Sequence, residues 1–371
     1  MKRLLTIFFL FLSLHSFPQA VLPVPDHIVI VLFENHAYNQ IIGSPEAPHI
    51  NALANSSKTA LFTQSYAIEY PSQPNYLDLF SGFNQGVTDA LFPQGAPFTT
   101  PNLARQLLDA GKTFITYSED LPYPGFNGES SGYYVRRHNP VANWMGNGPN
   151  QVPASVNQPL TAFPSDFNLL PTVCFVVPNL VNDMHDGSIA QGDQWMVDHL
   201  SEYIQWAKSH NSLFILTFDE DDKSMNNQIV TIFSGEMVKG GNYSGKINHY
   251  SLLRTIEQMY GLPYAGHAAT ARPITDCWVE MNPDPAALGK DDVLIYHNHP
   301  DQSILVEISE EFLLNNLTFA LTDVHGATAR ELAVRSHHST IPLAGLSSGV
   351  YIYQLRNQKK VFKKGKLMVI N

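Results

Sequence analysis

Four short polar segments place acid, amide, hydroxyl and imidazole groups just past the ends of apolar runs that are typical of strands. They are residues 33–36, 71–76, 182–186 and 218–222. In an open α/β sheet, ligands bind outside the carboxyl ends of the strands. We therefore expect the four segments to form one site. Their side chains supply metal ligands and a hydroxyl nucleophile, a combination that suits phosphoester hydrolysis.

Candidate metal ligands occur in two of these segments. Glu34 and Asn35 offer a carboxylate and a neutral amide oxygen, which suit a hard divalent cation, although an asparagine is also a good helix cap. Asp219 and Glu220 begin a run of four acids that repel one another unless a cation lies among them. We expect these four residues to bind a divalent metal ion, whose identity is left open.

Ser72 is the candidate nucleophile. The residues around it predict a short helix with Pro74 in its first turn and Gly82 after its end. At the N-terminus of that helix, the dipole and the free N–H groups favour an anion such as an alkoxide or a bound phosphate. Ser72 still needs activation by a base or a metal, and the alternative is a plain helix cap. Asn75 is a further polar candidate for the site.

The third segment adds imidazole and carboxylate groups. Asp183 and His185, two residues apart and followed by Asp186, can bind one ion or one phosphate, and His185 can act as general acid for the leaving group. The alternative is a polar, turn-rich loop. His249, at the start of a predicted helix at 250–260, can bind metal or phosphate, although a single histidine at a helix start is more often structural.

Other polar residues are expected outside the site. Asp221 and Asp222 should face solvent, because acids are seldom buried. The remaining histidines, including His337 and His338, should have surface or structural roles.

The elements that position these residues follow from the apolar pattern. Continuous apolar runs predict buried strands at 27–33, 113–117, 172–177, 213–218 and 229–233. Helical periodicity occurs at 101–110, 193–208 and 250–260. This alternation predicts an α/β fold, a mostly parallel sheet with helices on both faces. The region 121–168 is rich in Gly, Pro, Asn, Ser and aromatic residues, and we interpret it as a long insertion of loops over the site.

Composition limits the partners. The chain has 371 residues and a net charge of −11, which argues against a nucleic-acid-binding surface. Residues 301–371 carry a net charge of +2, so the rest of the chain carries −13. An acidic domain that handles anionic phosphate needs local cations, and metal ions usually provide them.

The domain organisation begins with export. Lys2 and Arg3 precede an apolar run at 4–14, which is typical of a cleaved signal peptide at residues 1–20, with an uncleaved anchor as the alternative. We then expect a catalytic domain at 21–282, a linker at 283–300 and a small all-β sandwich at 301–371.

The sequence leaves open whether the two cysteines form a disulfide. Export would permit a disulfide between Cys174 and Cys277. Cys174 lies inside an apolar run, so a buried free thiol is an equal alternative.

Taken together, the polar segments resemble the secreted phosphoesterase family, which joins bacterial acid phosphatases with phospholipase C-like enzymes in the alkaline phosphatase superfamily. The matching stretches, in the expected order, are 27–38, 71–82, 178–196, 216–221 and 247–263. The resemblance implies an alkaline phosphatase-like fold, metal ligands at Glu34, Asn35, Asp219 and Glu220, and a nucleophile at Ser72. It also implies further polar positions of the site at Asp183, His185 and His249. The sulfatase branch has an arginine in its nucleophile motif, and none follows Ser72 here.

The C-terminal region resembles the type A sorting domain of the type IX secretion system of Bacteroidetes. The likeness lies in residues 324–326, 341–343, 346–351 and the lysine-rich tail 359–366. It implies recognition by the type IX secretion machinery, and a protein that is secreted or tethered at the outer membrane surface. A generic β-sandwich binding module is the alternative.

We therefore predict an exported, metal-dependent phosphatase that hydrolyses phosphomonoesters through a phosphoserine at Ser72, with His185 or His249 as acid. The substrate would be a phosphorylated small molecule or a lipid head group, which aromatic and arginine residues of the insertion, Arg136 and Arg137 included, could bind. A phospholipase C-type phosphodiesterase uses the same core and is the nearer alternative. A non-catalytic surface binding protein is the more distant one.

Overall fold

The computed structural model describes residues 22–279, 293–298, 303–308, 316–358 and 360–369. It divides into two units, Met1–Val279 and Glu280–Asn371, and each is described by itself. The expected signal peptide lies outside the described residues. The expected linker 283–300 lies largely outside them too, and the part that is described forms the strand β12 (Val293–Asn298).

The first unit is built on a nine-stranded sheet in the order β10-β2-β9-β8-β1-β7-β3-β6, with β11 paired to β2. The five expected strands are confirmed to within one residue at either end. They are β1 (His27–Phe33), β3 (Phe114–Ser118), β7 (Val173–Val177), β8 (Ser212–Phe218) and β9 (Gln228–Ser234). The sheet is mostly parallel, as predicted, but β9 runs antiparallel to both of its neighbours, β8 and β2.

The remaining strands of this sheet are β2 (Thr59–Tyr66), β6 (Asn157–Pro159), β10 (Gly241–Tyr243) and β11 (Ile247–Asn248). The sequence pattern did not predict β2. Its second half carries polar residues such as Thr63 and Ser65, and the hydroxyl of Ser65 pairs with that of Thr231 on β9 at 2.7 Å. A strand that buries paired hydroxyls lacks the continuous apolar run that reveals its neighbours.

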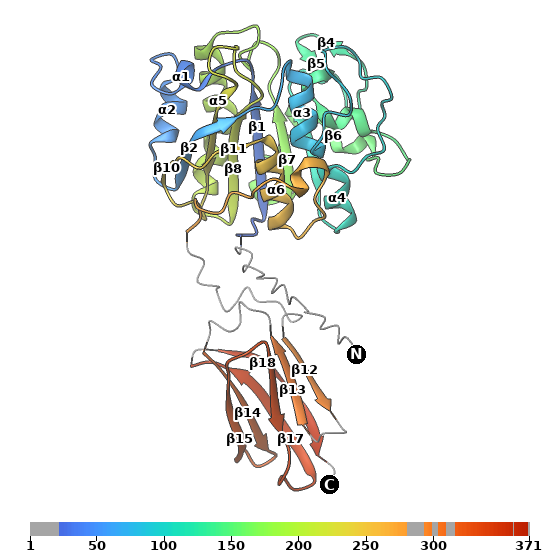
Figure 1. The fold of residues 1–371 in the computed structure, drawn as a ribbon, viewed down its shortest axis with the longest axis vertical. Helices are drawn as coiled ribbons and strands as arrows, with labels where there is room; N and C mark the ends of the chain where they lie inside the picture. The colour runs from blue at the N-terminus through green and yellow to red at the C-terminus, as the bar shows by residue number, and fades with distance from the viewer. Residues whose placement is uncertain (1–21, 280–292, 299–302, 309–315, 359, 370–371) are drawn as a thin grey trace, which may run out of the picture. The chain divides into compact units, whose positions relative to one another are not determined.

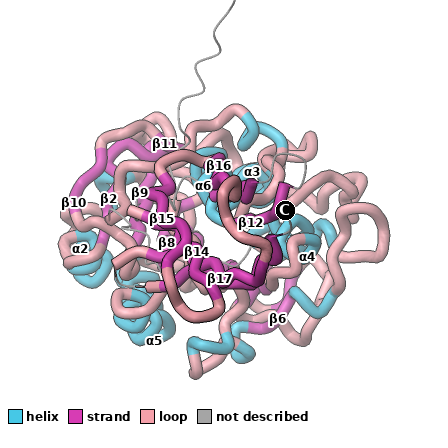
Figure 2. The backbone as a smooth tube through the Cα atoms, turned by 90° about the horizontal axis from the view of Figure 1, so that it is seen from below, coloured by secondary structure: helices cyan, strands magenta, loops and turns pink. Residues whose placement is uncertain are grey.

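Helices cover both faces of the sheet (Figures 1 and 2). Alternate residues of β1 divide between two cores: Ile28, Ile30 and Leu32 pack in one, and Val29, Val31 and Phe33 in the other. The first core includes side chains of α3 (Ser72–Ser81), α4 (Leu103–Asp109) and α6 (His249–Met259). The second includes side chains of α1 (Tyr38–Ile41), α2 (Pro48–Ala54) and α5 (Ile189–Ala207).

The helix that carries Ser72 is fixed at its far end by a glycine. Gly82 follows α3 with a φ of 70°, the left-handed conformation that commonly ends a helix. A Cβ atom at this position would lie 2.2 Å from the carbonyl oxygen of Ala265, so only glycine allows this close approach.

The insertion at 121–168 is more ordered than a set of loops. Its short elements are β4 (Ser130–Ser131), β5 (Tyr134–Val135), β6, and the 3₁₀ turns η1 (Arg136–His138), η2 (Pro140–Trp144), η3 (Ala154–Val156), η4 (Leu160–Ala162) and η5 (Phe167–Leu169). Buried Asn139 joins its two halves, because its amide donates to the Tyr134 hydroxyl at 3.1 Å and to Asn157 Oδ1 at 2.9 Å. A sixth 3₁₀ turn, η6 (Gly266–Ala269), follows α6.

The second unit contains two antiparallel sheets, β12-β13-β16 and β15-β14-β17-β18. Its other strands are β13 (Ser303–Ile308), β14 (Leu317–Asp323), β15 (Thr328–Val334), β16 (His338–Pro342), β17 (Gly349–Arg356) and β18 (Val361–Val369). Apolar side chains from both sheets form one core, which confirms the expected small β-sandwich.

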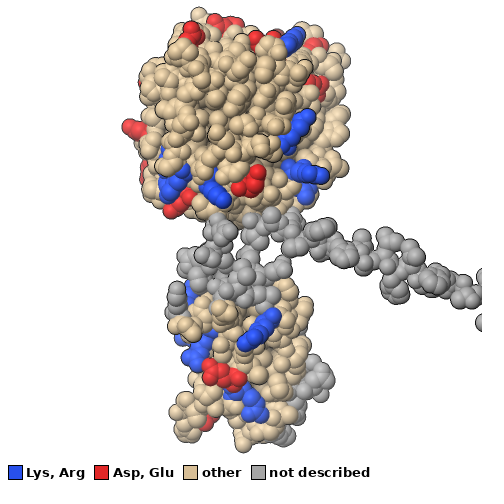
Figure 3. All heavy atoms as spheres, turned by 60° about the vertical axis from the view of Figure 1, so that its left-hand side comes forward, with Lys and Arg blue, Asp and Glu red and all other residues tan. Residues whose placement is uncertain are grey.

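Cys174 and Cys277 are both buried free thiols. In the described part of the chain, no helix is long and apolar enough to cross a membrane. Figure 3 shows acidic and basic side chains scattered singly over the visible face of the first unit, among many neutral ones.

Glu257 on α6 is a buried carboxyl group whose protonation is tied to folding. Its Oε1 accepts a hydrogen bond from the Ala265 backbone N–H at 2.8 Å, and burial raises its pKa to about 8. In the unfolded chain the same group ionises near its ordinary value of 4.5. The native state therefore binds more protons than the unfolded state between these pH values, so Glu257 makes the free energy of unfolding fall as pH rises.

We expect Glu257→Gln to reduce this dependence, because the amide cannot ionise. Between pH 5 and pH 8, the variant should lose less unfolding free energy than the wild type, by on the order of 1–3 kcal/mol. Urea denaturation at a series of pH values measures this, with exposed Glu236→Gln as the matched control. Parallel profiles for Glu257→Gln and wild type would show that this carboxyl is not protonated in the native state.

Candidate active site

Glu34 is the centre of the site. It follows β1 directly, is fully buried, and its backbone N–H donates to the carbonyl of Asp183 at 2.9 Å. Its Oε2 accepts from the Ser72 hydroxyl at 2.9 Å and from the Asn35 amide at 3.2 Å. Its Oε1 accepts from the Tyr76 hydroxyl at 2.7 Å. The two carboxylate oxygens therefore face different partners.

Ser72 is the first residue of α3, and Pro74 lies in the first turn as expected. The predicted place of Ser72 at a helix N-terminus is therefore confirmed. Its Oγ lies 2.9 Å from Glu34 Oε2 and 3.5 Å from Glu220 Oε1. Asn75 lies in the first turn of the same helix, and its amide donates to Glu220 Oε2 at 3.3 Å. The hydroxyl therefore lies between two acids and at the positive end of a helix dipole.

The register of the sheet brings the two acidic segments together. Phe33 on β1 pairs with Phe218 on β8, so Glu34 and Asp219 leave the sheet side by side. The backbone N–H of Asn35 donates to Asp219 Oδ1 at 3.1 Å, and Asn35 has a φ of 52°, which asparagine tolerates better than most residues. The other oxygen, Asp219 Oδ2, is buried and has no hydrogen-bond partner among the described residues.

The expectation that Asp221 faces solvent was wrong, although Asp222 is exposed. Asp221 is buried and closes the turn that follows β8. Its carboxylate accepts from the Tyr70 hydroxyl and from the backbone N–H groups of Lys223, Met225 and Asn227, the last three at 2.7–3.1 Å. These hydrogen bonds replace the water that the carboxylate loses on burial.

His138 enters the site from the insertion and is buried, so of the expected surface or structural role only the surface role is wrong. Its ring is buried and stacks on Tyr76, with 5.2 Å between ring centroids and an interplanar angle of 2°. Nδ1 lies 3.0 Å from Asp183 Oδ2, and Nε2 lies 3.2 Å from Glu34 Oε1. Despite that short distance, the Nε2 contact lacks hydrogen-bond geometry.

The third segment meets the site as predicted. Asp183 is buried, and its Oδ1 accepts from the backbone N–H of His185 at 2.8 Å. His185 is partly exposed, and its Nδ1 lies 2.7 Å from Oδ1 of exposed Asp186. Asp183 therefore orients His138 and the His185 backbone, while Asp186 lies at the rim and orients the His185 ring.

His249 contacts the main chain of the acidic segment 218–222. It begins α6, is buried, and its Nε2 lies 2.7 Å from the carbonyl oxygen of Asp219, to which the ring N–H donates. Burial lowers the pKa of its imidazole to about 4, so the ring is neutral near pH 7. Its expected role as an acid stays a prediction, and this contact identifies it as a positioning residue for Asp219.

The site concentrates acids that resist ionisation. Burial, followed by the charges of Asp219 and Asp183, raises the pKa of Glu34 well above its ordinary value. Burial raises the pKa of Asp219, and it raises those of Asp183 and Glu220 to about 8. Asp183 and Glu220 therefore favour a proton or a nearby cation at neutral pH, and the pKa values of Glu34 and Asp219 are shifted in the same direction.

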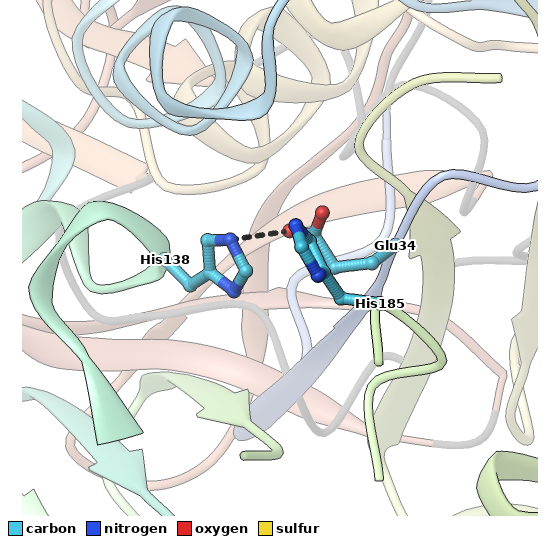
Figure 4. Close-up of side chains that lie close together, drawn as sticks. All are labelled: Glu34, His138 and His185. Atoms are coloured by element: carbon cyan, nitrogen blue, oxygen red, sulfur yellow. Dashed lines mark ion pairs between the residues drawn. The ribbon is translucent and has the colours of Figure 1, made fainter. Parts of the chain in front are cut away.

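Glu34, His138 and His185 form a cluster that could hold a metal ion, with ligand atoms all within 4.8 Å of one another (Figure 4). Each histidine has a carboxylate at Nδ1, which leaves Nε2 for a ligand; this pattern is common around metal-binding histidines. Burial lowers the pKa of His138 well below its ordinary value, so its imidazole is neutral, as metal binding requires. The donor set and the unpartnered Asp219 Oδ2 both fit a divalent cation.

The structure thus joins Glu34, Asn35, Ser72, Asn75, Asp183, His185, Asp219 and Glu220 in one network of contacts. The sequence did not predict two further residues of this network, Tyr76 and His138. Tyr76 lies four residues after Ser72 on the predicted helix and hence on the same face, a signal that could have revealed it. For His138, the only signal in the sequence was its position in the insertion at 121–168, which was expected to lie over the site.

Comparisons with known proteins relate both units of the chain to described families. Residues 44–263 match the family model described as the Phosphoesterase family, and residues 295–371 match the secretion system C-terminal sorting domain. The chain is 48% identical over 261 residues to a phosphatidylinositol-3-phosphatase of Mycobacterium tuberculosis, which covers 70% of this chain and 85% of that protein. It is 31% identical over 226 residues to an acid phosphatase of Aspergillus fumigatus, covering 57% of this chain and half of that protein. A solved structure from Vibrio parahaemolyticus, described as a protein in the alkaline phosphatase superfamily, aligns with a TM-score of 0.46 and 13% identity over 79% of each chain.

The raised pKa values predict how cations and pH act on stability. A carboxyl whose pKa is raised by folding contributes stability at low pH that is lost as pH rises through the native value, about 8 for Asp183 and Glu220. Without divalent cations, the unfolding temperature should fall by more than about 5 °C between pH 5.5 and pH 8.5. A bound cation favours the ionised acids, so saturating divalent ion should reduce or reverse this fall. Thermal scans with chelator and with single ions test this, and identical pH profiles in both conditions would contradict it.

Proposed function

Because this chain belongs to the Phosphoesterase family, we propose that it is a phosphatase that works through a phosphoserine intermediate on Ser72. Family membership and likeness to a phosphatidylinositol-3-phosphatase and several acid phosphatases make it an acid phosphatase-like phosphoric monoester hydrolase. The observation that carries the proposal is the contact of the buried Ser72 hydroxyl with Glu34 Oε2, 2.9 Å long, at the N-terminus of α3.

Ser72 is the nucleophile. Glu34 Oε2 accepts the hydrogen bond of its hydroxyl, which orients the oxygen and gives its proton an acceptor. The oxygen attacks phosphorus in line with the leaving oxygen, and a phosphate–serine bond replaces the phosphate–alcohol bond. Water then attacks the phosphoserine, which releases inorganic phosphate and returns the serine hydroxyl.

Glu34 is common to two sets of metal donors. Beside its Oε2 are the Asn35 amide, whose N–H group donates to it, and the carboxyl oxygens of Asp219 and Glu220. Beside its Oε1 is the imidazole of His138, with His185 close by. We assign a divalent cation to the oxygen set, because that set adjoins Ser72. A cation bound there supplies positive charge that lowers the pKa of the serine hydroxyl and neutralises phosphoryl oxygens.

His185 is the better placed of the two expected acids. It is partly exposed at the rim, where a leaving alcohol can depart, and Asp186 holds its ring. His249 is buried and donates to a main-chain carbonyl, so it lacks a free path to the substrate. We assign to His185 the proton that the leaving oxygen needs.

The sorting domain indicates export to the cell surface. We assign its recognition to the type IX secretion machinery and place the enzyme outside the cell or at the outer membrane surface of a Bacteroidetes-type bacterium. The substrate is then an external phosphorylated small molecule or a lipid head group. The name of the Mycobacterium tuberculosis relative, a phosphatidylinositol-3-phosphatase, supports phosphoinositides as one such class.

Replacing the nucleophile tests the mechanism. Ser72→Ala should lower kcat/KM for an aryl phosphomonoester by roughly 10³-fold or more, because no other hydroxyl takes the phosphoryl group. Exposed Ser155→Ala is the matched control and should keep wild-type activity. Acid quenching with radiolabelled substrate should trap label on Ser72 of the wild type. Near-wild-type turnover by Ser72→Ala would refute the phosphoserine route.

Metal content distinguishes the two donor sets. Chelation should abolish activity, and one divalent ion should restore it. Asp219→Asn should release the ion measured by elemental analysis, whereas His138→Gln should retain it if the ion lies among the oxygen donors. The reverse pattern would place the ion at Glu34, His138 and His185.

Activity on aryl phosphodiesters but not monoesters would favour the phospholipase C-type alternative.

A further inference from the structure

A small pocket is lined in part by the residues that follow Ser72 and precede His138 in the chain, Gln73 and Arg137. Its cavity volume is about 220 Å³, and it lies between the residues 90–93 and the residues 129–137. Gln73, the residue after Ser72, lines it, and its side-chain amide donates to the carbonyls of Asp89 at 3.1 Å and Leu91 at 2.8 Å. One wall of the pocket is therefore hydrogen-bonded to the helix turn that contains Ser72.

The opposite wall of the pocket is connected to the site through His138. Arg136 and Arg137 line the pocket and precede His138 in η1, which packs against α3. The His138 ring stacks on Tyr76 and its Nε2 lies 3.2 Å from Glu34, so η1 cannot move without disturbing the site. Figure 1 shows β4 and β5, which lead into η1, beside one end of α3.

The two arginines of this wall have different roles. Arg136 is buried, and its guanidinium donates to Asn143 Oδ1 at 2.9 Å and to the carbonyls of Asn127 and Ala142 at 2.9 and 2.7 Å. It also lies 4.5 Å from the centre of the Phe92 ring. Its hydrogen bonds are thus used to hold the insertion together.

Arg137 is half-buried, and its guanidinium forms no hydrogen bond or ion pair with any residue of the described chain. Its charge is close enough to the site to add to the effect of burial in lowering the pKa of His138. The pocket also contains exposed Glu129, so it is not uniformly basic. A half-buried guanidinium without a protein partner, beside a phosphoryl-transfer site, is suited to bind an anion of the substrate.

We propose that this pocket receives the alcohol part of the substrate and that Arg137 binds a second anionic group there. The inference rests on the proposed function and narrows its substrate class. Preferred substrates are then phosphomonoesters whose alcohol carries a second phosphate, either a phospholipid head group or a soluble compound. The volume is below the roughly 300–1,000 Å³ of pockets for drug-sized ligands, which suits a phosphate with part of a polyol ring.

The test compares two soluble substrates with the same scissile phosphate, inositol 3-phosphate and glycerophosphoinositol 3-phosphate. Only the second carries an additional phosphodiester. Arg137→Gln should lower kcat/KM for the second compound about 10- to 100-fold, the loss expected for a charge-assisted pair, and for the first less than threefold. Arg137→Lys should recover part of the loss, because the point charge remains but the planar fork does not.

Exposed Arg272→Gln is the matched control and should leave both values unchanged. Equal losses on the two substrates, or none on either, would overturn the inference while leaving the phosphatase proposal intact. No phosphate release from either compound by a wild type that hydrolyses an aryl phosphomonoester would also overturn the inference, whereas a wild type that hydrolyses no phosphomonoester at all would refute the proposed function. Diacyl phosphatidylinositol 3-phosphate in vesicles provides the lipid arm. An effect of Arg137 on vesicles alone, with the soluble pair unaffected, would also overturn the pocket assignment.

Discussion

The structure depends on one electrostatic constraint, which is that four carboxyl groups are buried together at the end of a parallel sheet. Glu34, Asp183, Asp219 and Glu220 have little or no exposure, and burial raises the pKa of each. Such a cluster is costly to fold unless protons or cations neutralise it. The cost is tolerated because it creates a strong preference for positive charge beside a serine hydroxyl.

The neighbouring elements serve this cluster. The parallel register of β1 and β8 places two of the acids side by side, and the glycine after α3 fixes the helix that presents Ser72. The insertion then supplies His138, whose ring stacks on Tyr76 and contacts both Glu34 and Asp183. The first unit therefore combines a rigid sheet edge, which holds the acids, with an insertion that adds imidazole and guanidinium groups near them.

The sequence was sufficient to predict the elements and residues that follow simple local rules. Apolar runs located five strands, and polar residues directly after them located Glu34, Asp219 and Glu220, because parallel strands end at one edge. It was not sufficient for features that depend on the path of a loop. His138 lies in a part of the insertion that the hydrogen bond between Asn139 and Asn157 joins to its other half, and the burial of Asp221 is accompanied by three backbone N–H groups that its turn directs at the carboxylate. Strand β2 was missed because its polar half is paired across the sheet.

The central claim, that a cation takes the place of protons among these acids, is tested most directly by counting the protons released when a divalent ion binds. Calorimetric titration of the chelator-treated protein at pH 6.5, in buffers of different ionisation enthalpy, gives that number. The account predicts saturable binding with release of at least one proton per ion, because Glu220, whose pKa burial raises to about 8, must ionise to become a ligand. Binding without proton release, or no binding of any divalent ion, would contradict it.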